Sequence, residues 1–304
     1  MQPQPICKRL IAFLRKESSA MLTVQRSMRK IVFLLLCCMG LSQAKTIIWD
    51  LGETLFSTSH FAFARTIGLQ HFLSYMLFDW KNPNIKPKVF DILERMNPSE
   101  EHPREIATDN EGNPLPIIMH KWLAGIISGA EIIKSMHDYI GQLEMQDYFV
   151  SKREKTLVVK TLEQMFNPQA LVDATYPITD AIELLHDCYH AKNEDGSPKN
   201  TLFILSNWDE VSFELLKKRY TSIFNTYFDL HRIVISGAIG LIKPARDAFL
   251  YVLKTYNLDP TDCIFIDDLY DNILAAQSVG ITSLMVCKNN YKTLRNILAR
   301  LGAL

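Results

Sequence analysis

Four short segments of the chain hold residues that could do chemistry together. They supply an aspartate, a hydroxyl and an amide, a lysine and a pair of acids, at Asp50, Ser206-Asn207, Lys243 and Asp267-Asp268. Carboxylate oxygens are the ligands that Mg²⁺ prefers, and the compact positive charge of a lysine suits a phosphate group. The combination predicts a metal and phosphate site, and therefore an enzyme.

Three of these segments end or closely follow a short apolar run that predicts a buried strand, at residues 46–49, 202–205 and 263–266. The carboxyl ends of parallel strands meet at one edge of an open α/β sheet, and this edge is where such folds bind ligands. The polar residues are therefore expected to lie close together.

The rest of the chain supplies elements that could position this edge. Further strands are predicted at 232–236 and 282–286, and helices at 178–190, 211–219, 247–256 and 271–279, with Pro244 near the first turn of the third helix. Strands that alternate with helices predict a doubly wound parallel sheet. Residues 59–174 are instead helical in pattern, with helices at 60–80, 89–96, 117–124, 130–143 and 151–166 and an exposed loop at 100–114.

In this order the segments resemble the motifs of the haloacid dehalogenase-like (HAD) hydrolase superfamily, and within it the short-cap phosphatases. The family pattern D-x-D-x-T, S or T, K-P and an acid pair is met by Asp50-Leu51-Gly52-Glu53-Thr54, Ser206-Asn207, Lys243-Pro244 and Asp267-Asp268, with Gly52 in place of the second aspartate. The resemblance covers the first motif and residues 178–286. It implies an α/β fold, with a doubly wound parallel-sheet (Rossmann-like) core at 45–57 and 175–304 and an inserted all-helical cap at 58–174.

The resemblance also implies a role for each motif residue. Asp50 would attack the phosphorus and form an aspartyl-phosphate, with Lys243 beside it as the second catalytic residue. The predicted Mg²⁺ ligands all offer oxygen: Asp50, the carbonyl of Gly52, Asp268 and Asp267. The predicted phosphate-binding residues are Ser206, Asn207 and Lys243, and Asn272 would support the loop of the acid pair. The implied partner is a small phosphorylated substrate, whose identity no cap motif indicates.

Each motif residue also has an interpretation without catalysis. The Ser206-Asn207 pair could only cap a helix, Asp267-Asp268 could be a solvated helix N-terminus, and Lys243 could be a surface lysine. Four further residues are expected to be packing groups or, for the last, a surface acid: Trp208, His120, Trp122 and Asp271.

Gly52 leaves the function open among three classes. In the family the missing aspartate protonates the leaving group and then activates water, and such acid–base help is worth about 10²–10⁴ in rate. We expect a phosphatase that is slow or favours good leaving groups, since Glu53 is displaced by one residue from the acid's position. The alternatives are a catalytically weak protein that binds a phosphorylated ligand or protein partner, and a metal-free haloacid dehalogenase, which would have no need of Asp267-Asp268.

The first 44 residues predict targeting rather than fold. Arg29 and Lys30 precede an apolar run at 31–41 and then Ser42-Gln43-Ala44, which is the order of a secretory signal peptide with its core at 28–44. The run is shorter than the roughly 20 residues that span a bilayer. We therefore expect export, with membrane contact only through this segment. An uncleaved anchor or a buried helix is the alternative, and the start at Met1, Met21 or Met28 stays open.

Composition excludes one class of partner. The 33 basic and 33 acidic residues balance to zero net charge without a basic stripe, so we expect no nucleic-acid binding. Beyond the targeting region the cysteines are Cys188, Cys263 and Cys287. We expect Cys263 and Cys287 to be buried small hydrophobes rather than a disulfide. No pattern indicates an oligomeric state.

Overall fold

The computed structural model describes residues 44–79, 84–96, 106–109, 111–287 and 290–304. The predicted targeting region lies outside the described residues apart from Ala44. Among the described helices, none combines the length and the apolar character that crossing a bilayer requires.

The core is a five-stranded sheet in which every neighbouring pair of strands is parallel, in the order β5-β4-β1-β6-β7. The strands are β1 (Lys45–Trp49), β4 (Asn200–Ser206), β5 (Ile233–Ile235), β6 (Cys263–Asp267) and β7 (Thr282–Met285). β1 occupies the centre, with Trp49 in register with Ile204 of β4 and Ile266 of β6. The chain therefore leaves β1, β4 and β6 at the same edge.

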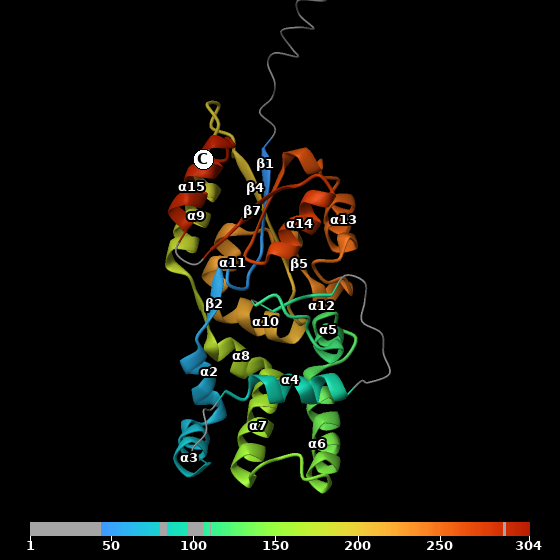
Figure 1. The fold of residues 1–304 in the computed structure, drawn as a ribbon. Helices are drawn as coiled ribbons and strands as arrows, with labels where there is room; N and C mark the ends of the chain where they lie inside the picture. Colours follow the sequence, from blue (N-terminus) through green and yellow to red (C-terminus); the bar gives the residue numbers. More distant parts are fainter. Residues whose placement is uncertain (1–43, 80–83, 97–105, 110, 288–289) are drawn as a thin grey trace, which may run out of the picture. The chain divides into compact units, whose positions relative to one another are not determined.

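Successive residues of β1 face opposite sides of the sheet, as the pleat requires. Ile47 and Trp49 belong to a cluster with α9 (Thr179–His190), α10 (Glu210–Arg219), α11 (Thr221–Tyr227) and α15 (Tyr291–Arg300). Ile48 belongs to the cluster on the other face, with α13 (Arg246–Thr255) and α14 (Tyr270–Ser278). Figure 1 shows these two helical layers on either side of the sheet. The predicted α/β, doubly wound, Rossmann-like core is confirmed.

A two-stranded antiparallel ribbon, β2 (Phe56–Thr58) with β3 (Thr175–Pro177), flanks a purely helical insert. The helices are α2 (His60–Ile67), α3 (Leu69–Asp79), α4 (Lys86–Arg95), α5 (Ile117–Leu123), α6 (Gly129–Met145), α7 (Lys152–Met165) and α8 (Pro168–Ala174). They share a buried cluster of their own, with Ile92, Leu157 and Leu162 fully buried. The inserted helical cap is thus present, and its division from the core at 58 and 174 stays a prediction.

Some predicted elements differ from the structure. The helix predicted over 60–80 is two helices, α2 and α3, because Gly68 between them has a φ of 100° that ends the first helix. The ribbon β2–β3 was not predicted, because three residues carry too little periodicity. Short elements after the second and third strands were missed for the same reason: α11, the 3₁₀ turn η1 (Leu230–Arg232) and α12 (Ser236–Ile239). A second 3₁₀ turn, η2 (Pro260–Asp262), and the last helix, α15, were missed as well.

Two local predictions were wrong. Pro244 does not lie in the first turn of α13, which begins at Arg246; it follows Lys243 in the turn before, through a cis peptide bond. The loop predicted as exposed over 100–114 is partly buried where it is described. Thr108 pairs with Pro114 in an antiparallel bridge, and Ala107 packs with Ile242 of the core.

The cysteine predictions hold only in part. Cys263 is buried in the core, but Cys287 is exposed, because it follows β7 at the surface. Cys188 is buried on α9. All three are free thiols, so no disulfide joins Cys263 to Cys287.

Candidate active site

The edge of the sheet brings together the first, second and fourth motifs. Asp50 directly follows β1, Ser206 is the last residue of β4, and Asp267 is the last residue of β6. The main-chain amide of Asp50 donates to the carbonyl of Ile266 at 2.9 Å, which continues the ladder to the site itself. Parallel pairing of β1 with both neighbours is therefore what places these side chains side by side.

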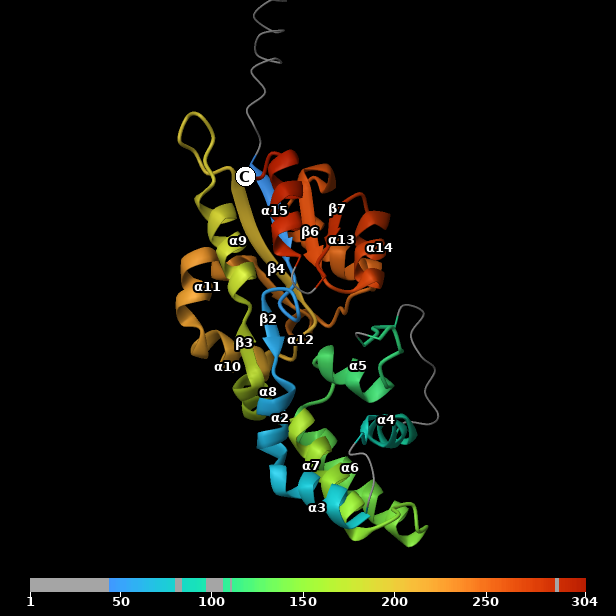
Figure 2. The same ribbon diagram turned by 60° about the vertical axis from the view of Figure 1, so that its left-hand side comes forward.

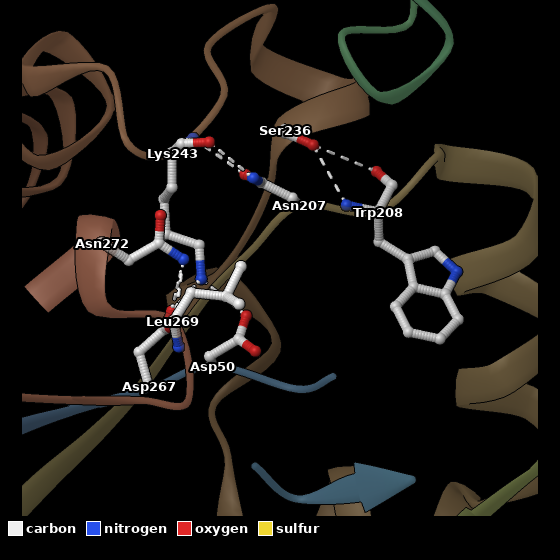
Figure 3. Close-up of polar contacts among 8 residues, drawn as sticks. All are labelled: Asp50, Asn207, Trp208, Ser236, Lys243, Asp267, Leu269 and Asn272. Atoms are coloured by element: carbon white, nitrogen blue, oxygen red, sulfur yellow. Dashed lines mark hydrogen bonds and ion pairs between the residues drawn. The ribbon is translucent and has the colours of Figure 1, made fainter. Parts of the chain in front are cut away.

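Lys243 joins two of the acids inside the protein. Its Nζ lies 2.6 Å from Oδ1 of Asp50 and 2.6 Å from Oδ2 of Asp267, and the residue is only 1% exposed (Figure 3). The interpretation of Lys243 as a surface lysine was wrong. A buried ammonium needs such partners, since an unpaired charge away from water is very costly.

Asp267 is held by hydrogen bonds to both carboxylate oxygens. Its Oδ1 accepts from the amide of Leu269 at 2.8 Å and from Nδ2 of Asn272 at 3.0 Å. Its Oδ2 accepts from Lys243 and, at 3.0 Å, from the same Asn272 nitrogen. Asp267 is fully buried at the end of β6, so it is no solvated helix N-terminus. Asn272 thus contacts the acid pair that it was predicted to support.

Asn207 holds the main chain of Lys243. Its Nδ2 donates to the Lys243 carbonyl at 2.7 Å, and its Oδ1 accepts from the Lys243 amide at 2.8 Å (Figure 3). The helix-cap interpretation of Ser206-Asn207 was wrong, because the residue that caps α10 is Asp209. Contacts of Ser206 and Asn207 with a substrate phosphate remain predictions.

The acids at this edge repel one another. Burial raises the pKa of Asp50 to about 6; Lys243 lowers it and the Asp267 charge raises it. Burial, with the charges of Asp50 and Asp267, raises the pKa of Asp268 to about 8. Burial alone would lower the pKa of Lys243, but the two carboxylates outweigh it and the pKa is raised. One ammonium therefore does not balance three carboxylates.

This imbalance fits a hard cation. Oxygen atoms of Asp50, Asp267 and Asp268 lie within 4.8 Å of one another, and these carboxylates are the sole group of three or more potential metal ligands among the described residues. A set made only of oxygen donors suits Mg²⁺, which takes few carboxylates and keeps waters. A bound cation would also relieve the repulsion that raises the pKa values of Asp50 and Asp268.

Gly52 leaves room for a side chain beside the nucleophile. A Cβ built on Gly52 would have Oδ2 of Asp50 as its nearest atom, at 3.8 Å, and the backbone is not in the left-handed region. Glu53 has a φ of 49°, and its carboxylate accepts from the hydroxyl of Ser57 at 2.9 Å and the amide of Thr58 at 3.1 Å. The neighbouring acid is therefore tied to β2.

A cavity of about 190 Å³ opens onto these residues. Its core side includes Asp50, Gly52, Glu53, Ser206, Asn207, Lys243, Asp268, Leu269 and Asn272. Its other wall comes from Ala107, Thr108, Leu115 and Leu123 of the cap, and from Trp208. Figure 2 shows α5, which ends at Leu123, close to α12 of the core.

Sequence reasoning missed this wall. Trp208 was predicted to be a packing group, and it does pack against the core cluster of Ile47 and Trp49, but it also lines the cavity. Trp122 does pack in the cap, where its ring meets Phe166 edge-on at 5.1 Å. In the sequence, Leu115 and Leu123 look like any other apolar residue of a core, and Ala107 lies in a polar stretch. Nothing in the local sequence marks these three residues as lining a cavity, because a contact between the cap and the core produces no local sequence pattern.

Asp271 matches the expectation of a helix-start acid. It is exposed in the first turn of α14, and its carboxylate accepts from the hydroxyl of Thr108 at 3.3 Å. It is not among the three clustered carboxylates.

Comparisons with known proteins agree with the fold. The chain matches the family of haloacid dehalogenase-like hydrolases over residues 44–280. A solved HAD-family enzyme from Bacteroides thetaiotaomicron shares the fold, with a TM-score of 0.51 and 20% identity over 83% of this chain and 98% of that one.

Two curated relatives match over shorter stretches. A drimenol cyclase from Aspergillus calidoustus is 33% identical over 99 residues, 33% of this chain and 18% of that protein. A bifunctional epoxide hydrolase from Rattus norvegicus is 26% identical over 88 residues, 28% of this chain and 15% of that protein. The chain spans less than a fifth of either relative. The family match covers most of the chain, and the chain belongs to the haloacid dehalogenase-like hydrolases.

Proposed function

We propose that this hydrolase is a Mg²⁺-dependent phosphatase that acts on a small phosphorylated molecule through Asp50. The observation that carries the proposal is the buried lysine between two aspartates: Lys243 lies 2.6 Å from both Asp50 and Asp267. Phosphoryl transfer needs a nucleophile and nearby groups that neutralise the charge of the phosphoryl oxygens. Asp50 would be the nucleophile, and Lys243 would be one of the neutralising groups.

The metal would be held by Asp50, by Asp268 and by the carbonyl of Gly52. Asp267 belongs to the same cluster, but its two oxygens already accept four hydrogen bonds, so it is the least available ligand. When bound, Mg²⁺ neutralises the charge of the phosphoryl oxygens and of the acids around them.

The residues of the chain would then divide the work. The Lys243 ammonium donates a hydrogen bond to Oδ1 of Asp50, which holds the carboxylate in place. The carboxylate attacks phosphorus, the bond from phosphorus to the leaving oxygen breaks, and an acyl phosphate forms on Asp50. Water then attacks the same phosphorus, releases the Asp50 carboxylate and keeps both of its protons on the phosphate. Asn207 keeps Lys243 in position throughout.

One observation favours a second candidate function. No side chain stands at position 52, and Glu53, which would be the nearest substitute, is bonded to Ser57 and Thr58. Without a general acid and base, the fold could serve to bind a phosphorylated ligand or protein partner with little turnover. A metal-free dehalogenase is less well supported, because that chemistry makes no use of the Asp267-Asp268 pair.

Turnover of a generic aryl phosphate tests the proposal. The full chain should release phosphate from it with Mg²⁺ present and lose that activity with EDTA. Asp50→Asn should be inactive while its circular dichroism spectrum stays unchanged, because the amide is nearly isosteric with the carboxylate. Binding of the ester without release of phosphate would favour the binding protein. Activity that survives EDTA would contradict the metal requirement.

A further inference from the structure

The cavity wall that comes from the cap carries no charge. It consists of Ala107, Thr108, Leu115 and Leu123, which line the cavity from the cap. Thr108 supplies the single polar side chain of this set, and its hydroxyl donates to Asp271 at 3.3 Å. The part of a substrate that lies beyond the phosphoryl group therefore meets apolar groups and one hydroxyl from the cap, and Trp208 from the core, whose buried indole nitrogen has no hydrogen-bond partner among the described residues.

Contacts with the core hold this wall in place. Ala107 and Leu115 pack with Ile242, which precedes Lys243, and the amide of Leu115 donates to the Ala107 carbonyl at 2.8 Å. The hydroxyl of Ser236 donates to the carbonyl of Leu123 at 2.7 Å. The same hydroxyl accepts from the Trp208 amide at 3.0 Å (Figure 3). The wall is thus fixed against the loops that carry the second and third motifs.

Charge at the site disfavours a second anionic group on the substrate. The ionisable residues that line the cavity are Asp50, Glu53, Lys243 and Asp268, so the described lining holds three acids and one lysine. That lysine is already paired with Asp50 and Asp267. A carboxylate on the leaving group would lose its water without gaining a cation, which is strongly unfavourable.

The volume of the cavity and the absence of an acid at position 52 narrow the class of substrate further. About 190 Å³ is below the roughly 300–1,000 Å³ of sites for drug-sized ligands. Gly52 offers no proton for a leaving alkoxide, whereas a carboxylic acid has a pKa of about 4 and leaves as its anion at neutral pH without a proton.

We propose, on the basis of the proposed function, that the preferred substrates are small acyl phosphates whose acyl group carries no charge. The Asp50 carboxylate forms a bond to phosphorus, the bond from phosphorus to the acyl oxygen breaks, and the acyl group leaves as a carboxylate. Water then cleaves the aspartyl-phosphate to the Asp50 carboxylate and dihydrogen phosphate. Both steps balance in charge and need no other reactant.

Three small phosphates test this assignment: acetyl phosphate, ethyl phosphate and phosphoglycolate. With Mg²⁺ and the full chain, we expect kcat/KM for acetyl phosphate to exceed both others by about 10-fold or more. Asp50→Asn measures the background hydrolysis of acetyl phosphate. Mass spectrometry of rapidly quenched wild-type protein should find a phosphoryl group on Asp50 with acetyl phosphate and not with phosphoglycolate.

Variants of the wall give a second readout. Thr108→Lys, made together with Asp271→Asn so that the neighbouring carboxylate does not pair with the new ammonium, adds a cation at a half-buried position and should raise kcat/KM for phosphoglycolate relative to acetyl phosphate by about 10-fold. Thr108→Val keeps the shape without the charge, and should keep the wild-type order of substrates.

The outcomes separate the two proposals. The proposed substrate class is overturned if kcat/KM for phosphoglycolate or ethyl phosphate equals that for acetyl phosphate, or if the folded protein with Thr108→Lys and Asp271→Asn keeps the wild-type order of substrates. In either case the proposed phosphatase activity is still supported. If neither these compounds nor an aryl phosphate is turned over, the phosphatase itself fails and the substrate class with it.

Discussion

The side-chain amide of Asn207 binds the main chain of Lys243 at both ends. Nδ2 donates to the Lys243 carbonyl at 2.7 Å and Oδ1 accepts from the Lys243 amide at 2.8 Å. The two residues are 36 positions apart in the sequence and lie in different motifs. Asn207 therefore sets where the Lys243 backbone lies, and through it where the ammonium meets Asp50.

Asn207→Asp should disturb this relationship with little change in size. The new carboxylate would face the Lys243 carbonyl instead of donating to it, and leaving such buried groups unpaired costs about 1–3 kcal/mol. We expect kcat on an aryl phosphate to fall about 10-fold or more and the melting temperature to drop. Asn225→Asp on the exposed surface of α11 is the matched control and should change neither. Equal kinetics in the two variants would show that Asn207 does not position the lysine.

Asp268→Asn should weaken Mg²⁺ binding and raise the free energy of unfolding of the protein without metal. The pKa of Asp268 is raised from 3.8 to about 8 by burial and by Asp50 and Asp267, so the fold favours its neutral form. Without metal, this acid therefore costs more stability as pH rises from 3.8 to about 8. At pH 7 the asparagine variant should gain on the order of 1–3 kcal/mol, whereas Mg²⁺ should stabilise the wild type more.

Thermal melts with and without Mg²⁺, at pH 5 and pH 8, measure both changes. The Mg²⁺ concentration for half-maximal activity should also rise sharply in the variant, because one anionic ligand is lost. Asp271→Asn removes an exposed acid outside the carboxylate cluster, and it should leave both the melts without metal and the Mg²⁺ requirement as in wild type. A less stable Asp268→Asn protein without metal would contradict the repulsion argument.

The motif residues could be predicted because they follow strands. Asp50, Ser206 and Asp267 all end short apolar runs, and parallel pairing brings such ends together whatever the chain between them does. Which residue of the site contacts which other residue could not be predicted. Whether Asn207 binds a substrate or the Lys243 backbone depends on the path of a turn, and spacing in the sequence does not encode that path.

The cavity wall was unpredictable for a different reason. Ala107 and Leu115 reach the site because a small hairpin, bridged between Thr108 and Pro114, packs on Ile242. A polar stretch with glycine and prolines predicts an exposed loop, and only the contact with the core overrides that tendency. The insert as a whole was visible as helical periodicity, while its contacts with the core were not.

Glu154 should make cap stability depend on pH. Its carboxylate accepts from Lys88 at 2.6 Å, from the Val150 amide at 2.8 Å and from Tyr75 at 3.3 Å, which links α7 to α4 and α3. Burial alone would raise the pKa of Glu154, but these hydrogen bonds outweigh it and the pKa is lowered. Since the folded pKa is the lower one, the stabilisation is present above 4.5 and is lost as pH falls through the folded value.

Glu154→Gln should therefore lower the free energy of unfolding by about 1–3 kcal/mol at pH 7, with a difference that shrinks below pH 4.5. Urea unfolding at both pH values measures it. Glu144→Gln breaks an ion pair with Lys155 that is largely exposed, and should cost at most about 1 kcal/mol. A Glu154→Gln loss independent of pH would contradict the role of the charge.

The N-terminal prediction is independent of the site. The order of charged, apolar and small residues that ends at Ala44 predicts export and cleavage immediately before β1. Mass spectrometry of the protein from its native host should find a chain that begins at Lys45. Replacing Arg29 and Lys30 by glutamine should slow processing, whereas replacing Lys16 should not. Intact Met1 or Met28 protein in the cytosol would contradict export.

Gly52→Asp tests what the missing acid costs. The position can accept a side chain: the nearest atom to a built Cβ is Oδ2 of Asp50 at 3.8 Å, and the backbone has no left-handed φ. If protonation of the leaving group limits the wild type, aryl and acyl phosphates should turn over well and alkyl phosphates poorly. The variant should then raise turnover of alkyl phosphates by up to about 10²-fold, and reduce the dependence of rate on leaving-group pKa.

The added carboxylate also brings a fourth acid to the cluster of Asp50, Asp267 and Asp268, which holds one lysine. Its negative charge should raise the pKa of Asp50 further and so reduce the fraction of the nucleophile that is ionised, which would cancel some of this gain. Gly52→Asn is the matched control, because it has the same shape and no proton to give. It should leave alkyl phosphate turnover at the wild-type level. If wild-type rates do not vary with the leaving group and neither variant changes them, another group already supplies the proton. Glu53→Gln would then be the next substitution, because Glu53 is the remaining acid of the first motif that lines the cavity.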